Sequence, residues 1–162
     1  MKLIDNNLLD SLTQKAKGAT RKRMNYNLHP SPDDVVQRLF NAIEPDTYIR
    51  PHRHSDPLSF EVFLIMRGSA VLLFFNDEGS VIERKVLSAG GETIGVEIPA
   101  NTWHTMASLE SGTIFFEVKK GPYVRPSGQN IAAWAPEEGN PKAARFVKWY
   151  CNAKAGDAPL TL

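Results

Sequence analysis

The chain has 162 residues, of which 42% are hydrophobic, and its formal net charge is +1. This length suits one domain with a hydrophobic core of its own. A net charge so close to zero creates no strong field that would attract nucleic acid or an anionic membrane. We therefore expect neither nucleic acid nor a membrane as a partner.

The single cysteine and the polar N-terminus bear on where the protein works. Cys151 has no second cysteine with which to form an intrachain disulfide, which fits a reducing compartment. No apolar segment typical of a secretory signal follows Met1, and no run approaches the roughly 20 apolar residues of a membrane helix. These features predict a cytoplasmic protein.

A short helix is predicted over residues 5–17, where leucines recur on one helical face. Asp5 can cap its start and Gly18 can end it. A basic stretch over residues 15–23 follows, and it is either a solvated surface or an anion-binding rim.

Residues 33–120 are predicted to form a β-barrel or sandwich. Short runs rich in valine, isoleucine, phenylalanine and threonine are separated by turn residues, and Asn76–Gly79 is typical of a hairpin turn. Many short strands at regular spacing indicate an antiparallel all-β fold. The predicted strands are Val35–Ile43, Thr47–Arg53, Glu61–Arg67, Ala70–Phe75, Val81–Leu87, Thr93–Ile98, Trp103–Ser108 and Thr113–Lys119.

The remaining part, residues 121–162, begins as an irregular segment rich in proline and glycine. A final helix is predicted over Ala143–Ala153, with Asn140 as its cap and Pro141 in its first turn. Helices at both ends of one β region favour a single domain over residues 1–162, with residues 1–32 as the N-terminal helix and lead-in.

Four side chains suggest a metal site. His52 and His54 alternate in a predicted strand, so both imidazoles point to the same side, together with Arg50. Glu61 opens the next apolar strand, where a buried carboxylate needs a partner. His104 follows the turn at residues 98–103. Three imidazoles and a carboxylate suit one divalent transition metal, namely Zn, Fe, Mn, Co or Ni.

These residues resemble two motifs of the cupin superfamily. The first combines the two histidines at 52 and 54 with Glu61 and, after six intervening residues, Gly68; the second combines Pro99, Asn101 and His104. The resemblance implies a small double-sheet barrel of the jelly-roll type, in which His52, His54, Glu61 and His104 converge on one metal ion. Six residues separate His54 from Glu61, a longer loop than the motif usually has.

Further segments look like the WbuC family of cupin metalloproteins. They are Arg23–His29 before the barrel, residues 98–104 within it, and Gly121–Tyr123 with Trp134–Gly139 after it. This resemblance covers nearly the whole chain. It implies a link to bacterial surface-polysaccharide biosynthesis, and cupin barrels in general imply a homodimer.

Three functions are compatible with such a site. The first is a metal-dependent isomerase or epimerase that acts on a small polar metabolite such as a sugar or nucleotide-sugar. The second is an Fe(II)-dependent dioxygenase, and the third is a non-catalytic protein that binds a small molecule. In each case Arg50, Tyr26 and Tyr123 are the candidates for contacts with the small-molecule ligand. The sequence does not identify a general base.

Overall fold

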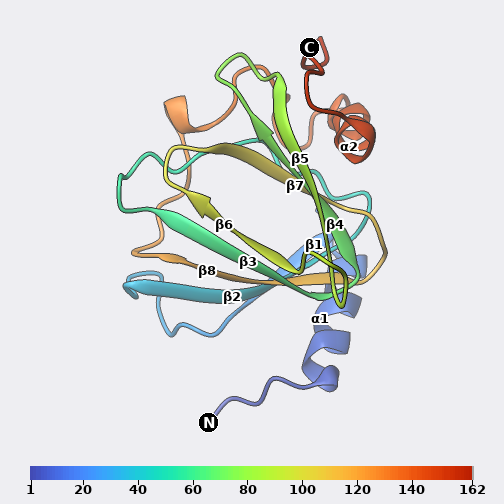
Figure 1. The fold of residues 1–162 in the computed structure, drawn as a ribbon. Coiled ribbons are helices and arrows are strands. Elements are labelled where there is room, and N and C mark those ends of the chain that lie inside the picture. Colours follow the sequence, from blue (N-terminus) through green and yellow to red (C-terminus); the bar gives the residue numbers. More distant parts are fainter. Residues whose placement is uncertain (162) are drawn as a thin grey trace.

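A computed structural model describes residues 1–161, so Leu162, the last residue of the predicted domain, lies outside the described residues. Two antiparallel sheets face each other across a common interior (Figure 1). One has five strands in the order β1-β2-β8-β3-β6, and the other has three in the order β5-β4-β7. The strands are β1 (Arg23–Asn27), β2 (Val36–Ile43), β3 (Phe60–Arg67), β4 (Ser69–Phe75), β5 (Val81–Ser88), β6 (Gly95–Pro99), β7 (Trp103–Ser108) and β8 (Thr113–Lys120).

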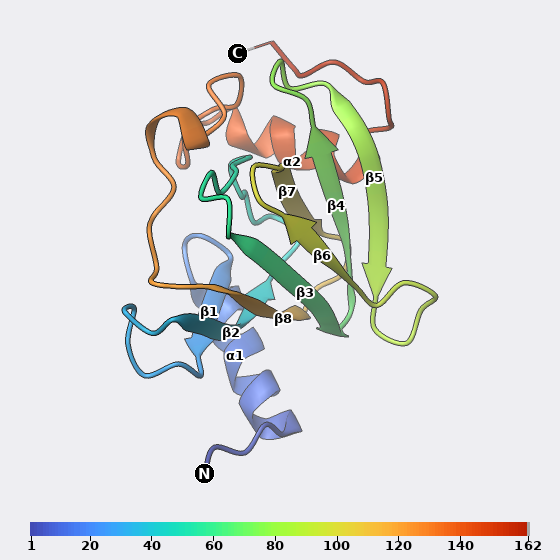
Figure 2. The same cartoon turned by 60° about the vertical axis from the view of Figure 1, so that its left-hand side comes forward.

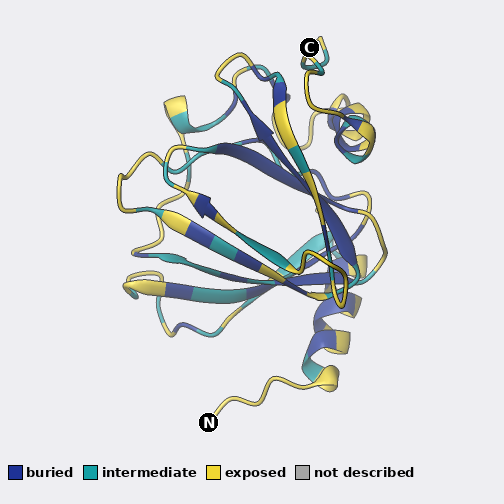
Figure 3. Ribbon diagram, in the orientation of Figure 1, coloured by how far each residue is buried: buried dark blue, intermediate teal, exposed yellow. Residues whose placement is uncertain are grey.

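The space between the sheets holds one apolar core. Alternate residues of each strand point inward, and on β3 and β8 these include Phe63, Ile65 and Phe115. They meet Leu72 and Met106 from the opposite sheet. Strands β4 and β7 are buried along their length, because other elements also cover their outer faces (Figure 3). This confirms the predicted all-β, double-sheet architecture.

Helix α1 (Asn6–Gly18) covers the outer face of the five-stranded sheet near β1 and β2 (Figure 2). Leu9 and Leu12 pack there against Phe40 of β2 and Ile114 of β8. The helix begins as expected, because the Asp5 carboxylate accepts a hydrogen bond of 2.9 Å from the Leu8 backbone N–H.

Helix α2 (Ala143–Asn152) covers the outer face of the three-stranded sheet, where Phe146 and Tyr150 pack against Val71 of β4. It begins three residues after Asn140, which lies in the turn before the helix and accepts a hydrogen bond from the Lys142 N–H. A short 3-10 helix, Gly128–Asn130, lies in the connection from β8. Within residues 1–161, no helix has both the length and the apolar character needed to cross a membrane.

Two details of the predicted strands are wrong. Thr47–Arg53 is not a strand: it joins the sheets only through single bridges at His52, and Pro51 in its middle has no N–H to donate. The polar run Arg23–Asn27, in contrast, forms β1 and pairs with β2. Its pattern of basic and amide side chains does not resemble a strand, and the strand is stabilised by pairing with β2 and packing under α1.

Candidate metal centre

The four predicted ligands come from three segments. His52 and His54 lie in the extended segment before β3, Glu61 is the second residue of β3, and His104 is the second residue of β7. The backbones of His52 and His104 join the first segment to β7, since the His52 N–H donates to the His104 carbonyl at 3.1 Å and the His104 N–H donates to the His52 carbonyl at 3.0 Å. Their imidazole centroids are therefore only 4.6 Å apart.

The structure brings one potential ligand atom from each of the four residues within 4.8 Å of all the others. The Glu61 Oε2 lies 3.0 Å from His104 Nε2, and Oε1 lies 3.2 Å from His54 Nε2. In a tetrahedral or octahedral site with metal–ligand bonds of about 2.1 Å, neighbouring ligand atoms lie about 3.0 to 3.4 Å apart. The spacing fits a coordination shell.

Two of the imidazoles are fixed by backbone carbonyls. The Nδ1 of His52 lies 3.0 Å from the Arg50 carbonyl oxygen, and the Nδ1 of His104 lies 2.9 Å from the Thr102 carbonyl oxygen. A carbonyl oxygen can only accept, so each Nδ1 carries the hydrogen and each Nε2 keeps its lone pair. This arrangement holds metal-binding histidines in the required tautomer and orientation.

Several buried polar atoms of the four-residue cluster have no hydrogen-bond partner among the described residues. The His54 Nε2, the His104 Nε2 and the Glu61 Oε2 are buried, and none makes a hydrogen bond of acceptable geometry to any residue in the described part of the chain. Buried polar atoms without partners are costly and rare in proteins. A cation that accepts electron pairs from all of them would remove this cost, so the residues present fit a bound metal ion.

The electrostatics of the cluster without a metal follow from burial and from one carboxylate. Burial, followed by the neighbouring His104, lowers the pKa of His52 to about 3. For His104, burial acts to lower the pKa, but the negative charge of the Glu61 carboxylate 3.0 Å away stabilises the protonated form and the pKa is raised. Burial acts to raise the pKa of Glu61, yet His104 and His54 hold it well below its usual range.

A buried ion pair lies directly behind Glu61. The Lys119 Nζ lies 3.3 Å from Glu61 Oε1 and 2.5 Å from Glu117 Oε1. The Asn41 amide donates to the other oxygen of Glu117 at 2.7 Å. Burial acts to lower the pKa of Lys119, but the two carboxylates outweigh it and raise that pKa, while burial raises the pKa of Glu117. Lys119 thus orients the carboxylate of a candidate ligand.

The prediction from sequence did not include Glu117 or Asn41. A signal was present in β8, where residues 115, 117 and 119 share the inward face because side chains alternate along a strand. Phe115 fits the apolar core, whereas a glutamate and a lysine at the next two inward positions do not. Polar residues in the inward phase of a core strand therefore indicate the site.

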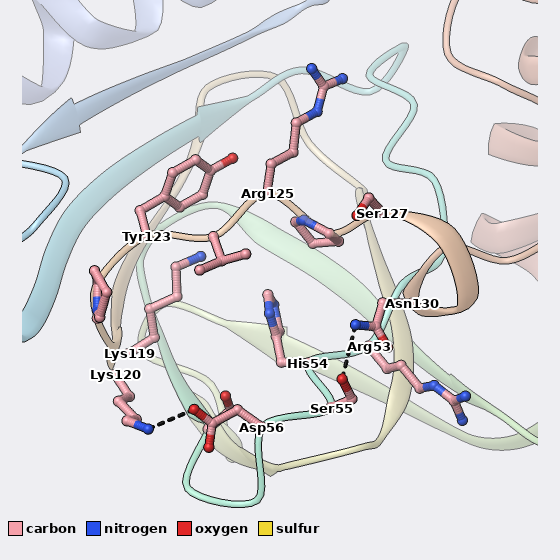
Figure 4. Close-up of a pocket in the computed structure, with 15 residues that line it drawn as sticks. Arg53, His54, Ser55, Asp56, Lys119, Lys120, Tyr123, Arg125, Ser127 and Asn130 are labelled. Carbon is pink, nitrogen blue, oxygen red and sulfur yellow. Dashed lines mark hydrogen bonds and ion pairs between the residues drawn. The ribbon is translucent and has the colours of Figure 1, made fainter.

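A cavity of about 310 Å³ opens beside His54. Figure 4 shows the His54 ring near its centre, with Lys119 and Tyr123 on one side and Arg53 and Asn130 on the other. Most of the charged side chains around it are basic, which would favour an anionic group on a ligand. The charged residues that line it are Arg53, Asp56, Lys119, Lys120 and Arg125.

Of the three predicted ligand-contact residues, only Tyr123 lies at this cavity. Arg50 shares no face with the imidazoles, because its segment is not a strand, and its guanidinium donates to the Ala132 carbonyl at 2.9 and 3.1 Å. Tyr26 points outward: it is paired with Phe40 in the register of β1 and β2, and both pack in the cluster under α1. The structure therefore does not bring Arg50 or Tyr26 to the candidate site.

The long loop before β3 does not displace Glu61. Its residues 55–59 lie outside the sheet, and β3 begins at Phe60. Glu61 pairs with Ile98 of β6 on one side and with Lys119 of β8 on the other, so its side chain points inward. The additional residues enlarge the rim of the cavity, which Ser55, Asp56 and Ser59 help to line.

The chain matches one known sequence family. The family described as "Domain of unknown function (DUF6016)" matches residues 4–87, which span α1, β1–β4 and most of β5. No curated protein is significantly similar to the chain in sequence.

Solved structures resemble this fold at low sequence identity. A cupin 2 domain-containing protein from Halorhodospira halophila has a TM-score of 0.52 and 15% identity, covering 88% of this chain and 90% of its own. A cupin superfamily protein from Desulfitobacterium hafniense DCB-2 has a TM-score of 0.50 and 16% identity, covering 67% and 86%. The capsular polysaccharide assembling protein CapF from Staphylococcus aureus has a TM-score of 0.53 and 19% identity, covering 67% of this chain. The present chain spans only 29% of CapF.

Proposed function

This chain belongs to the family described as Domain of unknown function (DUF6016) and has the cupin fold, and we propose that it is a divalent-metal-binding protein that acts on a small polar metabolite. The observation that carries the proposal is the convergence of potential ligand atoms from His52, His54, Glu61 and His104 within 4.8 Å of one another. The buried, unpaired atoms of His54, Glu61 and His104 support a cation more strongly than they support a hydrogen-bonded cluster.

The ligand set narrows the metal to a transition ion. Three imidazole nitrogens and one carboxylate oxygen suit Zn, Fe, Mn, Co or Ni and do not suit Ca, which prefers six to eight oxygen ligands. Such an ion would supply Lewis-acid polarisation of a carbonyl or hydroxyl oxygen on the substrate. The imidazoles keep their Nε2 lone pairs available because Nδ1 of His52 and of His104 is committed to a backbone carbonyl.

The protein's own side chains define the direction of approach. Of the four candidate ligands, only His54 lines the cavity of about 310 Å³, so a substrate would enter from that side. Lys119 occupies the wall between this cavity and Glu61, where it can hold the carboxylate in place and present a positive charge to the substrate. Tyr123 lies on the same wall, with its ring centroid 5.8 Å from the Lys119 Nζ.

Sugars and nucleotide-sugars are the substrate class that we propose, with isomerisation or epimerisation as the reaction. The resemblance to WbuC-like sequences supports this class, and the basic lining of the cavity suits the phosphate of a nucleotide-sugar. CapF, which shares the fold over part of its length, is described as a capsular polysaccharide assembling protein, and a role in surface-polysaccharide biosynthesis is compatible with that description.

Metal analysis joined to a substrate screen tests the proposal. We expect purified protein to hold about one transition-metal ion per chain, and we expect His104→Ala to lose it, whereas folded protein with His29→Ala, a change at the buried histidine outside the ligand cluster, should keep it. Each metal-loaded form is then incubated with nucleotide-sugars, and proton exchange with D₂O or a change of configuration is followed by NMR. Full metal content in His104→Ala would contradict the site. Turnover of none of these sugars by any loaded form, or O₂ consumption with iron alone, would contradict the proposed reaction.

A further inference from the structure

A second cavity, of about 430 Å³, lies beside the first. Asn25 of β1, Asn41 of β2 and Glu117 of β8 line it, and none of these three is a candidate metal ligand. Lys119 and Tyr123 line both cavities, so the two spaces meet at these side chains. We call the second cavity the amide groove, after Asn25 and Asn41.

Asn25, Asn41 and Glu117 share the inward face of the five-stranded sheet. Asn25 is paired with Asn41, and Asn41 with Phe115, so all three side chains point to the same face. Glu117 is two residues beyond Phe115 and shares that face. At Phe115 the face is part of the apolar core, whereas at Asn41 and Glu117 it is polar. The inward face therefore changes from apolar to polar in the direction of the candidate metal centre.

Placing polar groups at inward positions costs free energy, which hydrogen bonds and ion pairs only offset, so polar residues there call for an explanation. A metal ion would account for Glu61, but it does not account for Glu117, which belongs to no candidate ligand set in the described chain. Glu117 is 6% exposed: its Oε1 lies 2.5 Å from the Lys119 Nζ, and its Oε2 accepts the hydrogen bond from Asn41 at 2.7 Å. A carboxylate oxygen has two lone pairs, so the Oε2 of this cavity-lining residue can accept a second donor from a ligand.

The groups around Glu117 define the chemistry of that ligand. The Asn41 amide already donates to Glu117 Oε2, which leaves its carbonyl oxygen directed to other donors, and Asn25 lies directly across from Asn41. Adjacent carboxylate and amide groups offer acceptors and donors at short spacing, and each hydroxyl group can both donate and accept. Tyr123 adds a half-exposed aromatic wall, which can pack against the C–H face of a ring.

We propose that the amide groove is a subsite for the hydroxyl-bearing ring of a sugar, with Asn25, Asn41 and Glu117 as its hydrogen-bonding groups. This inference rests on the proposed function, because the sugar reaches the candidate metal centre past Lys119 and Tyr123. In the amide groove the sugar ring would extend away from His54 along the inner face of β1 and β2. An anionic substituent of the sugar would then occupy the basic cavity beside His54.

Saturation-transfer NMR with free sugars tests the subsite. The probes are D-glucose, D-galactose and D-mannose at millimolar concentration, with zinc-loaded full-length protein whose zinc content is measured in the same sample. We expect transfer to at least one sugar. Asn25→Ala and Asn41→Ala are expected to weaken its binding about fivefold each, the effect of losing about one hydrogen bond. Asn25 is exposed and on an edge strand, so its variant remains informative if Asn41→Ala does not fold.

Asn152→Ala is the matched control, because Asn152 is an exposed asparagine on α2, on the opposite side of the barrel. It is expected to bind the sugar as the unchanged protein does. Zinc-loaded protein that gives no transfer to any of the three sugars would overturn the subsite and leave the metal centre standing, as would unchanged affinity in both groove variants. Sugar binding that depends on Asn25 and Asn41 in protein that binds none of Zn, Fe, Mn, Co or Ni would support the subsite and overturn the proposed metal function.

Discussion

The backbones of His52 and His104 exchange two hydrogen bonds, of 3.1 and 3.0 Å, although the residues are 52 positions apart in the chain. The exchange joins a segment that belongs to no strand to the edge strand of the three-stranded sheet. Both imidazoles are then directed at Glu61, which comes from the opposite sheet. The candidate centre thus connects the two sheets at one end of the barrel, and a bound metal ion is expected to stabilise the fold there.

Glu61→Gln tests the carboxylate as a ligand. The change preserves the size of the side chain and removes its negative charge, so it lowers the electrostatic attraction for a cation. We expect the zinc affinity to fall by more than tenfold, since residues that only orient metal ligands already contribute about 10–100-fold. Competition with a chromophoric chelator measures the affinity. Glu97→Gln, on the outward face of β6, is the control and should bind zinc normally.

Acidification should release the metal. The pKa of His104 is raised above its ordinary value of 6.5 in the metal-free site, so protons compete with the metal for its Nε2 as the pH falls. In metal-free protein the protonated His104 pairs with Glu61, and this contribution to stability is present at low pH and is lost as the pH rises through the raised pKa.

The two effects have opposite signs, so the difference in melting temperature between metal-loaded and metal-free protein should grow between about pH 5 and pH 8. Differential scanning fluorimetry of both forms across this range measures it. His104→Gln should remove most of the pH dependence. A difference that is constant with pH in the unchanged protein would show that His104 does not bind the metal.

Lys119→Met tests the ion pair behind Glu61. It leaves Glu117 buried without its cation, and breaking a buried pair in this way costs about 3–5 kcal/mol of unfolding free energy. Urea denaturation of the metal-free protein measures the loss, and adding Glu117→Leu should recover part of it. Lys120→Met is the matched control, because Lys120 pairs with Asp56 at the surface and its loss should cost less than about 1 kcal/mol. Equal losses in the two lysine variants would contradict the role assigned to Lys119.

Leu12→Ala tests whether the stability of the fold and metal binding at the candidate centre are independent. Leu12 is 3% exposed between α1 and the five-stranded sheet, and its truncation should lower the free energy of unfolding by about 2–5 kcal/mol. Folded protein should still bind one metal ion, since α1 does not contribute to the centre. Leu3→Ala, at a side chain that is 69% exposed, should change the stability by less than about 0.5 kcal/mol. Loss of metal from folded Leu12→Ala protein would show that α1 supports the centre.

Periodicity in the sequence was enough to predict an antiparallel barrel or sandwich and both helices, because alternation and capping are local signals. The resemblance to the cupin motifs supplied the double-sheet barrel and the convergence of His52, His54, Glu61 and His104, which the structure shows. Pro51 is a local signal against a strand at residues 47–53 that the prediction overlooked, and in this segment the Arg50 guanidinium donates to the Ala132 carbonyl. Local signals did not reveal β1, whose pairing with β2 places Tyr26 under α1, or the dependence of Glu61 on Lys119 from β8.

X-ray absorption spectroscopy at the edge of the bound metal tests the central claim most directly, because it counts the imidazole ligands around the ion. The account predicts one metal ion per chain with three imidazole nitrogens and at least one oxygen, at about 2.0–2.2 Å. In His104→Ala or His52→Ala protein that retains some metal, the count should fall to two imidazoles. A spectrum with no imidazole ligands, or one unchanged in both variants, would contradict the assignment.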